Sequence, residues 1–311
     1  MVFELTDNVH RDNHGKVQHL EHFQEPFVAV SPADDQAEVD EDSGAYRAAT
    51  AQILAENYLR EVAPIYGIHA STLPGAGGHD ALAAESSAAP PGHSTLELVE
   101  EKEVMGTTLV SYQQKYDGLP VWEAGVSITI QPDPMRITAS QSSVKEDISL
   151  PEESLEAAPY SPGDITPGTL KSLLGVRTSE VPTLNATPQV LIYEYDPDQR
   201  FDPETRHTPT ERLEEAPPKL PLPPVPSTLA PQHFYRVIEV LFALPVPGHD
   251  SLNWRAFIES TTGAVLYLRA LTACATGLVF QQDPITAGAP VAPPTGPAAA
   301  LNSFRSAVAL E

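Results

Sequence analysis

Apolar residues recur at helical spacing over residues 43–68, near the start of the chain. Ser43 can cap a helix there, and Pro64 and Gly67 should end or bend it. The apolar positions follow one another in steps of three or four residues, which predicts a helix with one buried face. These positions are Ala48, Ala51, Ala55, Tyr58, Val62 and Ile65.

Alternating apolar and polar residues predict antiparallel strands between residues 96 and 144. The stretch 126–131 reads Val-Ser-Ile-Thr-Ile-Gln, the pattern of a strand with one buried face. Asp117-Gly118 predicts a turn between two strands, and Thr262-Gly263 predicts another. A short helix is expected at 166–174, and further strands are expected at 189–195, 234–244, 252–259 and 264–271.

The order of elements, a helix followed by strands, occurs twice and predicts the α+β class. We expect two consecutive cystatin-like units, each a helix packed on an antiparallel sheet. The first unit is placed at 43–150, and the second at 160–272 with a Pro-rich insert at 196–232 that we interpret as a stiff spacer. Residues 1–42 are polar and acidic and are expected to form a flexible tail, and 273–311 a linker.

The charge balance excludes several classes of partner. Lys and Arg number 18 against 42 Asp and Glu, a net charge of −24, which repels phosphate backbones and anionic lipid surfaces. We therefore expect neither a nucleic-acid partner nor a membrane partner, and no apolar run is long enough to span a bilayer. Residues 1–22 lack the basic start and apolar core of a signal peptide. A leader removed earlier, another export route and retention inside the cell all stay open.

The chain lacks the motifs that would assemble a catalytic site. It has no H-E-x-x-H and no G-x-S-x-G, and Gly75 to Gly78 lack the context of a nucleotide-binding loop. The pairs His10/His14 and His19/His22 have helix-compatible spacing, yet nothing nearby completes a metal site. We predict no catalytic residue, metal site or cofactor in this chain.

One dense motif resembles a known family. The stretch 112–122 reads Tyr-Gln-Gln-Lys-Tyr-Asp-Gly-Leu-Pro-Val-Trp and is followed by Gly-Val. It resembles the strand–turn–strand core of the fungalysin/thermolysin propeptide domain. The positions that carry the resemblance are Tyr112, Gln113, Gln114, Tyr116, Gly118, Pro120, Trp122 and Gly125.

A second resemblance follows in the order that this family shows. Residues 234–240, 254–259 and 262–266, which include Trp254 and Gly263, are similar to the PepSY domain of such proregions. Residues 277–285 and 301–305 are similar to the linker that leads into the peptidase. The Pro-rich insert is unmatched, and Pro132-Asp133-Pro134 replaces the usual hairpin turn.

The resemblance implies the proregion of a secreted thermolysin/fungalysin-like zinc metallopeptidase precursor. Such a proregion acts as an intramolecular chaperone and inhibitor of its cognate peptidase domain, in cis or in trans. Zinc would then belong to the downstream peptidase domain, and this chain would not itself be the enzyme. Two alternatives stay open: a free-standing inhibitor or binding module that acts in trans, and the structural N-terminal region of a degenerate, non-catalytic homologue.

The motif residues and the single cysteine each have two interpretations. The motif side chains either build the sheet or contact the peptidase, and large anchors such as Trp122 and Trp254 usually lie in cores. Cys274 is either an incidental thiol or a latency residue whose thiolate ligates the catalytic zinc.

Overall fold

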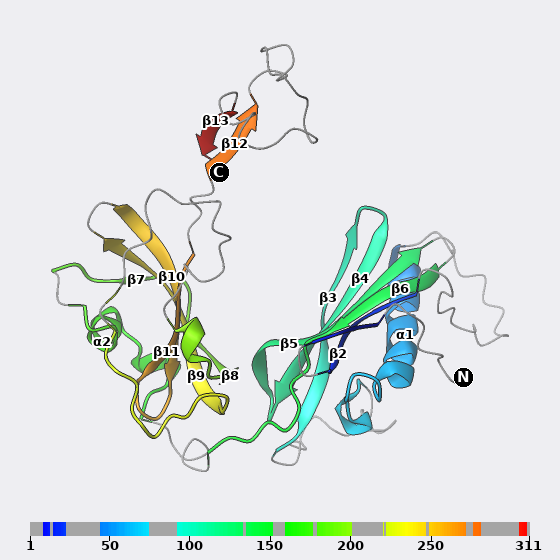
Figure 1. Ribbon diagram of the computed structural model, residues 1–311, viewed down its shortest axis with the longest axis horizontal. Helices are drawn as coiled ribbons and strands as arrows, with labels where there is room; N and C mark the ends of the chain where they lie inside the picture. Colours follow the sequence, from blue (N-terminus) through cyan, green and yellow to red (C-terminus); the bar gives the residue numbers. More distant parts are fainter. Residues whose placement is uncertain are drawn as a thin grey trace.

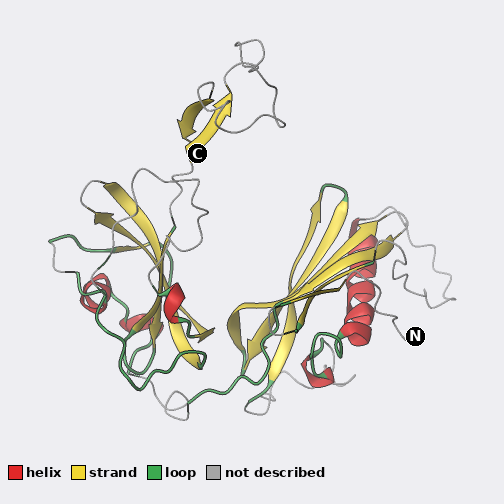
Figure 2. Ribbon diagram, viewed as in Figure 1, coloured by secondary structure: helices red, strands yellow, loops and turns green. Residues whose placement is uncertain are grey.

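The computed structural model of the protein has the predicted α+β class, and strands make up most of it (Figure 1, Figure 2). The structure describes residues 9–12, 15–22, 44–74, 92–132, 135–151, 159–176, 179–200, 220, 222–246, 249–271, 276–280 and 305–309. Its strands form one eleven-stranded sheet and a separate pair. The division into two cystatin-like units stays a prediction.

The first section of the sheet contains β1 to β6 and is covered on one face by helix α1 (Gly44–Val62) (Figure 1). Its strand order is β1-β2-β6-β5-β4-β3, and every pair is antiparallel. Buried apolar residues of the helix and the strands share one core. The strands are β1 Val9–Arg11, β2 Val17–Glu21, β3 Ser94–Val104, β4 Thr107–Tyr116, β5 Leu119–Pro132 and β6 Met135–Ser142.

The helix starts near the predicted position and ends at Val62, before Pro64. The chain then turns through Gly67, whose positive φ of 72° suits a residue without a Cβ atom. A 3₁₀ turn, Ala70–Thr72, follows. The helix ends before residue 68, the end of the predicted stretch, because Pro64 has no backbone N–H to donate to the helical hydrogen-bond ladder.

A polar network lies inside this otherwise apolar core. The Tyr58 and Tyr66 hydroxyls each lie 2.6 Å from Ser140 Oγ, and His22 Nε2 lies 2.7 Å from the Tyr58 hydroxyl. Burial raises the pKa of Tyr66 to about 12 and lowers the pKa of His22. The hydrogen bonds offset the desolvation of these buried groups.

The second section of the sheet contains β7 to β11, with the short helix α2 (Pro167–Leu173) packed on one face. β8, β9, β10 and β11 pair antiparallel in that order, and β7 pairs with the far end of β9. The opposite face carries an aromatic cluster. The strands are β7 Thr183–Leu184, β8 Gln189–Glu194, β9 Phe234–Val246, β10 His249–Glu259 and β11 Val265–Ala270.

Short elements complete the described chain. The 3₁₀ turn Pro162–Asp164 precedes α2, and Pro197–Gln199 follows β8. β12 (Thr276–Phe280) and β13 (Arg305–Ala309) pair antiparallel as a separate two-stranded sheet, within the stretch expected to be a linker. No helix among the described residues is long and apolar enough to cross a membrane.

The two sections meet where β5 pairs with β8. Val121 and Ile192 are register partners in a parallel pair, the point at which one continuous sheet passes from one section to the other. Both side chains are buried in a small core together with Tyr116, Ala124 and Ile148. Strand β5 therefore belongs to both sections. Its second half pairs with β6 of the first section, and Val121 near its start pairs with β8 of the second section.

The expectation of a flexible tail at 1–42 is wrong for β1 and β2. β2 pairs with β6 in the register His19↔Gln141, Leu20↔Ser140 and Glu21↔Ala139, so the start of the chain extends the sheet. Val17 and Leu20 are buried against the first core. Two apolar residues in a polar stretch are a weak signal, and the partner strand lies far away in the sequence.

The described part of the Pro-rich insert also packs on the protein. Leu220 is buried in the core beside α2, and Val225 and Leu229 lie against the aromatic cluster of the opposite face. The interpretation of the insert as a stiff spacer is therefore wrong for this stretch, because its apolar side chains pack on the second section of the sheet. Residues 201–219 of the insert lie outside the described residues.

Candidate functional site

The residues of the predicted motif lie in the hairpin β4–β5, which forms a meander with the preceding strand β3. Tyr112 is buried in the first core, and Tyr116 is buried at the junction with the second section. Asp117-Gly118 forms the predicted turn, with positive φ at both residues. The Asp117 carboxylate accepts hydrogen bonds from the backbone N–H groups of Gly92 (2.7 Å) and His93 (3.1 Å), which ties the start of β3 to this turn.

Gln113 fixes a kink at the start of β5. Its Nε2 atom donates to the carbonyl oxygens of Val121 (2.6 Å) and Ala124 (2.9 Å). The β4–β5 register shifts after Gln113, and Glu123 adopts a positive φ of 51° inside the kink. Such a bulge re-aims the side chains it carries. The Gln113 amide supplies hydrogen bonds that the regular ladder would otherwise have made.

Gln114 points the opposite way and holds the chain that follows β6. It is 1 % exposed, and its amide makes a reciprocal pair with Lys145. Gln114 Nε2 donates to the Lys145 carbonyl oxygen, Lys145 N–H donates to Gln114 Oε1, and both distances are 2.8 Å. The two successive glutamines thus position two different segments near the same junction.

Gly125 allows the kinked strand to approach β4 closely. A Cβ atom at this position would overlap with the carbonyl oxygen of Tyr112. Pro120 stands near the start of β5, opposite Lys115 in the register. Both motif residues therefore serve the local backbone geometry.

Trp122, which the kink carries, contacts the second section of the sheet. Its ring packs edge-to-face against Phe257 with centroids 4.8 Å apart. The Arg255 guanidinium carbon lies 4.8 Å from the Trp122 ring centroid, and Arg255 Nε lies 2.8 Å from Glu239 Oε1. Trp122, near the end of the motif, therefore connects the two sections through an aromatic contact with Phe257 and a cation–π contact with Arg255.

The other predicted residues lie away from this contact. Trp254 is buried in the core beside α2. Gly263 has a positive φ of 74° in the predicted Thr262-Gly263 turn, and a Cβ atom there would press on Tyr160 and Leu173. Cys274 lies outside the described residues.

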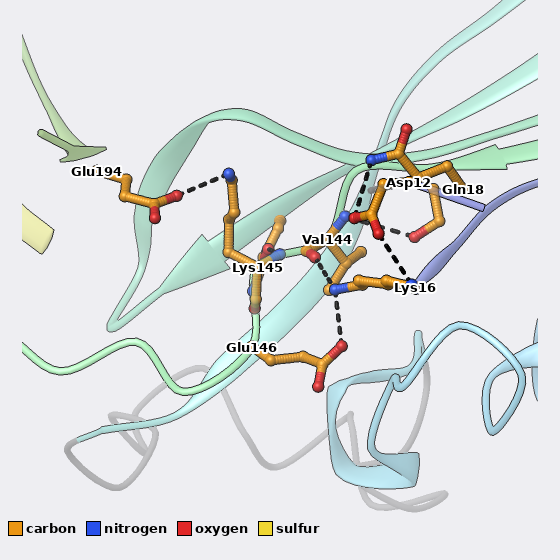
Figure 3. A network of polar contacts seen from close by, with 9 residues as sticks. Asp12, Lys16, Gln18, Val144, Lys145, Glu146 and Glu194 are labelled. Atoms are coloured by element: carbon orange, nitrogen blue, oxygen red, sulfur yellow. Dashed lines mark hydrogen bonds and ion pairs between the residues drawn. The ribbon is translucent and has the colours of Figure 1, made fainter. Parts of the chain in front are cut away.

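A cleft of about 800 Å³ opens beside the kink, between the two sections, and we call it the junction cleft. Two ion pairs lie on its wall, Lys16–Glu146 and Lys145–Glu194, each with an N–O distance of 2.7 Å (Figure 3). Lys16 also donates to the Val144 carbonyl oxygen at 2.7 Å. The lining of the junction cleft also includes Trp122, Glu123, Tyr193, Asp196 and Tyr267.

Among the described residues, no group of three His, Cys, Asp or Glu side chains is arranged to hold a metal ion. His10 and His19 do face each other across β1 and β2, with rings 5.4 Å apart, and His19 Nε2 lies 3.2 Å from Glu21 Oε1. The cleft combines aromatic rings with carboxylates, a lining suited to a side chain or peptide segment.

Sequence reasoning found the motif but missed most of the cleft. Glu123, Tyr193 and Asp196 lie on its wall, yet no spacing in the sequence links them. They meet because β5 and β8 pair, and that pairing involves only Val121 and Ile192 as register partners. The one available signal was Trp122, a large aromatic residue directly after a turn-and-strand motif.

Comparison with known families supports the motif. The fungalysin/thermolysin propeptide motif matches residues 96–133, which contain nearly all of β3 and the whole of β4 and β5. The predicted propeptide motif is thereby confirmed at these residues. The match covers the meander and not the rest of the chain.

Other comparisons are more distant. No curated protein matches the chain significantly. Four chains of solved structures match it, among them the Bacillus megaterium YpeB C-terminal domain, at 10% identity and a TM-score of 0.24. That alignment covers 57% of this chain and 57% of the other. The predicted PepSY resemblance stays a prediction.

Proposed function

We propose that this chain is the proregion of a secreted zinc metallopeptidase and acts as intramolecular chaperone and inhibitor of the peptidase domain in the same precursor. The observation that carries the proposal is the propeptide motif at residues 96–133. In this proposal the two cystatin-like units form one pre-folded body, and residues 273–311 connect it to the peptidase.

The structure offers a physical basis for such a role. The motif builds a kinked strand that joins two sheet sections through Val121 and Trp122, so their binding surfaces are presented together. A pre-folded surface that binds the native peptidase stabilises it by mass action. Covalent tethering supplies a high effective concentration, so individually weak contacts keep the substrate cleft closed until the connection is cut.

The charge of the chain favours a partner with basic surface. With 18 cationic and 42 anionic residues, the proregion would attract complementary patches on the peptidase and accelerate their encounter. The zinc ion of this proposal belongs to the peptidase domain.

The test begins by reading the frame beyond Glu311 for H-E-x-x-H and a downstream Glu. The encoded peptidase domain is then denatured and refolded with and without an equimolar amount of the 311-residue chain. Refolding with the chain should give a higher recovered peptidase activity than refolding without it, measured after the chain has been removed by proteolysis. Chain added to peptidase that is already folded should inhibit its activity.

A matched control sharpens this experiment. Bovine serum albumin at equal mass, which is also acidic, controls for non-specific protection during refolding. If the frame encodes a peptidase and the chain neither inhibits it nor raises its refolding yield above that control, the proposal is wrong. A stop codon after Glu311 would instead favour a module acting in trans.

A further inference from the structure

The hydroxyl of Tyr193 is a buried polar group without a hydrogen-bond partner among the described residues. Tyr193 is 5 % exposed and lies on the wall of the junction cleft. The backbone N–H of Asp196 approaches this oxygen without meeting hydrogen-bond geometry. An unpaired buried hydroxyl costs free energy, so its persistence beside a cleft points to a partner supplied from outside.

Two carboxylates accompany this hydroxyl. Glu123 and Asp196 line the same cleft as Tyr193. Burial raises the pKa of Tyr193, and the negative charges of Asp196 and Glu123 raise it further. Glu123 is exposed and sits in the left-handed kink of β5, and Asp196 caps the turn after β8 by accepting from Asp198 N–H. Neither carboxylate has an ion-pair partner within the described part of the chain.

The cations of the cleft are already neutralised. Lys16 pairs with Glu146, and Lys145 pairs with Glu194 (Figure 3). The cleft therefore presents a net negative surface around Tyr193. A bound cation would complete the arrangement, whereas an anion would meet uncompensated carboxylates.

Aromatic rings border the same cleft. Tyr267 lies 5.9 Å from Tyr193 and 6.2 Å from Trp122, measured between ring centroids. Trp122 is half-buried and the two tyrosines are buried, so the rings border the cleft next to the carboxylates mainly through their edges. Carboxylates together with aromatic rings favour a guanidinium group, which is planar, stacks on rings and donates several hydrogen bonds in a fixed fork.

We propose that the junction cleft receives an arginine side chain of the peptidase domain, with the guanidinium donating to the Tyr193 hydroxyl oxygen and pairing with Glu123 and Asp196. This inference rests on the proposed function for the source of the arginine. A second copy of the chain is disfavoured as the source, because two bodies of net charge −24 repel each other. A lysine would offer a point charge without the planar fork.

The test uses the whole chain and N-acetyl-argininamide as the probe. The chain has two tryptophans, so its ¹⁵N-labelled form shows two indole N–H signals, which a Trp122→Phe variant assigns. We expect the Trp122 signal to shift with added probe and the Trp254 signal to stay in place. The citrulline analogue, which has the same shape without the charge, should produce no shift, and N-acetyl-lysinamide a weaker one.

Variants separate recognition from folding. Tyr193→Phe removes only the unpaired hydroxyl, so we expect an unchanged or raised melting temperature and about tenfold weaker probe binding. Glu123→Gln and Asp196→Asn should weaken binding several-fold. The matched control is Glu97→Gln on β3, which removes an equal charge from an exposed pair with Lys115 and should leave binding unchanged.

Three results would overturn the inference. The Trp122 indole signal could fail to shift with N-acetyl-argininamide, or it could shift equally with the citrulline analogue. The Tyr193→Phe variant could also bind N-acetyl-argininamide as tightly as the wild type. The peptidase assay keeps this failure distinct from that of the proposed function. Inhibition by wild type and equally by the cleft variants would remove only the arginine site. Probe binding by a wild-type chain that does not inhibit the peptidase would remove the assignment to that partner.

Discussion

The side-chain amide of Gln113 donates to the backbone carbonyl of Val121 at 2.6 Å, across the hairpin that joins β4 to β5. Val121 is the residue that pairs with Ile192 of β8. One glutamine thus supports the backbone at the point where the two sections of the sheet join.

Replacing Gln113 should therefore loosen the junction. Gln113→Ala leaves the carbonyl oxygens of Val121 and Ala124 without this donor, and we expect a loss of about 1–3 kcal/mol in the free energy of unfolding. Urea denaturation followed by circular dichroism measures it. Gln131→Ala, at the far end of the neighbouring strand β5 and hydrogen-bonded to Arg136, is the control and should cost less than half as much. Equal losses for the two variants would contradict this role.

Removing the Trp122 ring should uncouple the two sections. Trp122→Ala loses the contacts with Phe257 and Arg255, and we expect a loss of about 2–3 kcal/mol, less than for a fully buried tryptophan. Trp254 is then the sole tryptophan and reports on the second section, while circular dichroism reports on the whole chain.

The midpoints from these two signals should separate in Trp122→Ala and coincide in Trp122→Phe, which keeps an aromatic ring. Coincident midpoints in Trp122→Ala would show that the backbone pairing at Val121 suffices to couple the sections.

Gly125 should tolerate no side chain. Gly125→Ala places a Cβ atom against the Tyr112 carbonyl oxygen, and either β4 or β5 must shift to make room. We expect a loss of several kcal/mol or no soluble protein. Gly168→Ala in α2 is the matched control, because its Cβ atom would lie 3.8 Å from Thr166 Oγ1, an ordinary contact. The melting temperatures of the two variants test this prediction. A Gly125→Ala variant as stable as Gly168→Ala would contradict the close approach of Gly125 to the Tyr112 carbonyl oxygen.

Stability should fall on acidification through His22. Burial lowers the pKa of His22 first, and the charge of His19 lowers it further, below the ordinary 6.5. The unfolded chain therefore binds this proton more readily than the folded chain. The contribution of His22 is present above pH 6.5 and is lost as the pH falls through the lowered folded-state pKa.

Urea midpoints at pH 7.5 and pH 5.0 test this dependence. The decrease in the urea midpoint from pH 7.5 to pH 5.0 should be smaller in His22→Gln than in wild type, because glutamine does not titrate. His69→Gln is the control, since His69 is exposed and its side chain makes no capping hydrogen bond. A drop of the same size in wild type and His22→Gln would exclude His22 as the titrating group.

The sequence was informative wherever structure is local. The alternation at 126–131 lies inside β5, Asp117-Gly118 and Thr262-Gly263 form turns, and the apolar spacing at 48–62 marks helix α1. These elements depend on neighbouring residues and on which face is buried.

The remainder depends on contacts between distant residues. β2 is built from a polar stretch that becomes a strand only because β6, some 120 residues later, offers it an edge. The junction cleft likewise arises from one pairing between β5 and β8. Neither contact leaves a periodic trace in the sequence, and tertiary context decides such strands.

The pairing of β2 with β6 bears on how shorter versions of this protein would behave in storage. A version starting at residue 43, the boundary that the sequence indicates, would lack the two strands that cover the outer side of β6. Its backbone N–H and C=O groups along Ala139–Gln141 would face solvent as an open template for other chains. Such a trimmed protein would also lack the buried side chains of Val17 and Leu20, and it should precipitate over time.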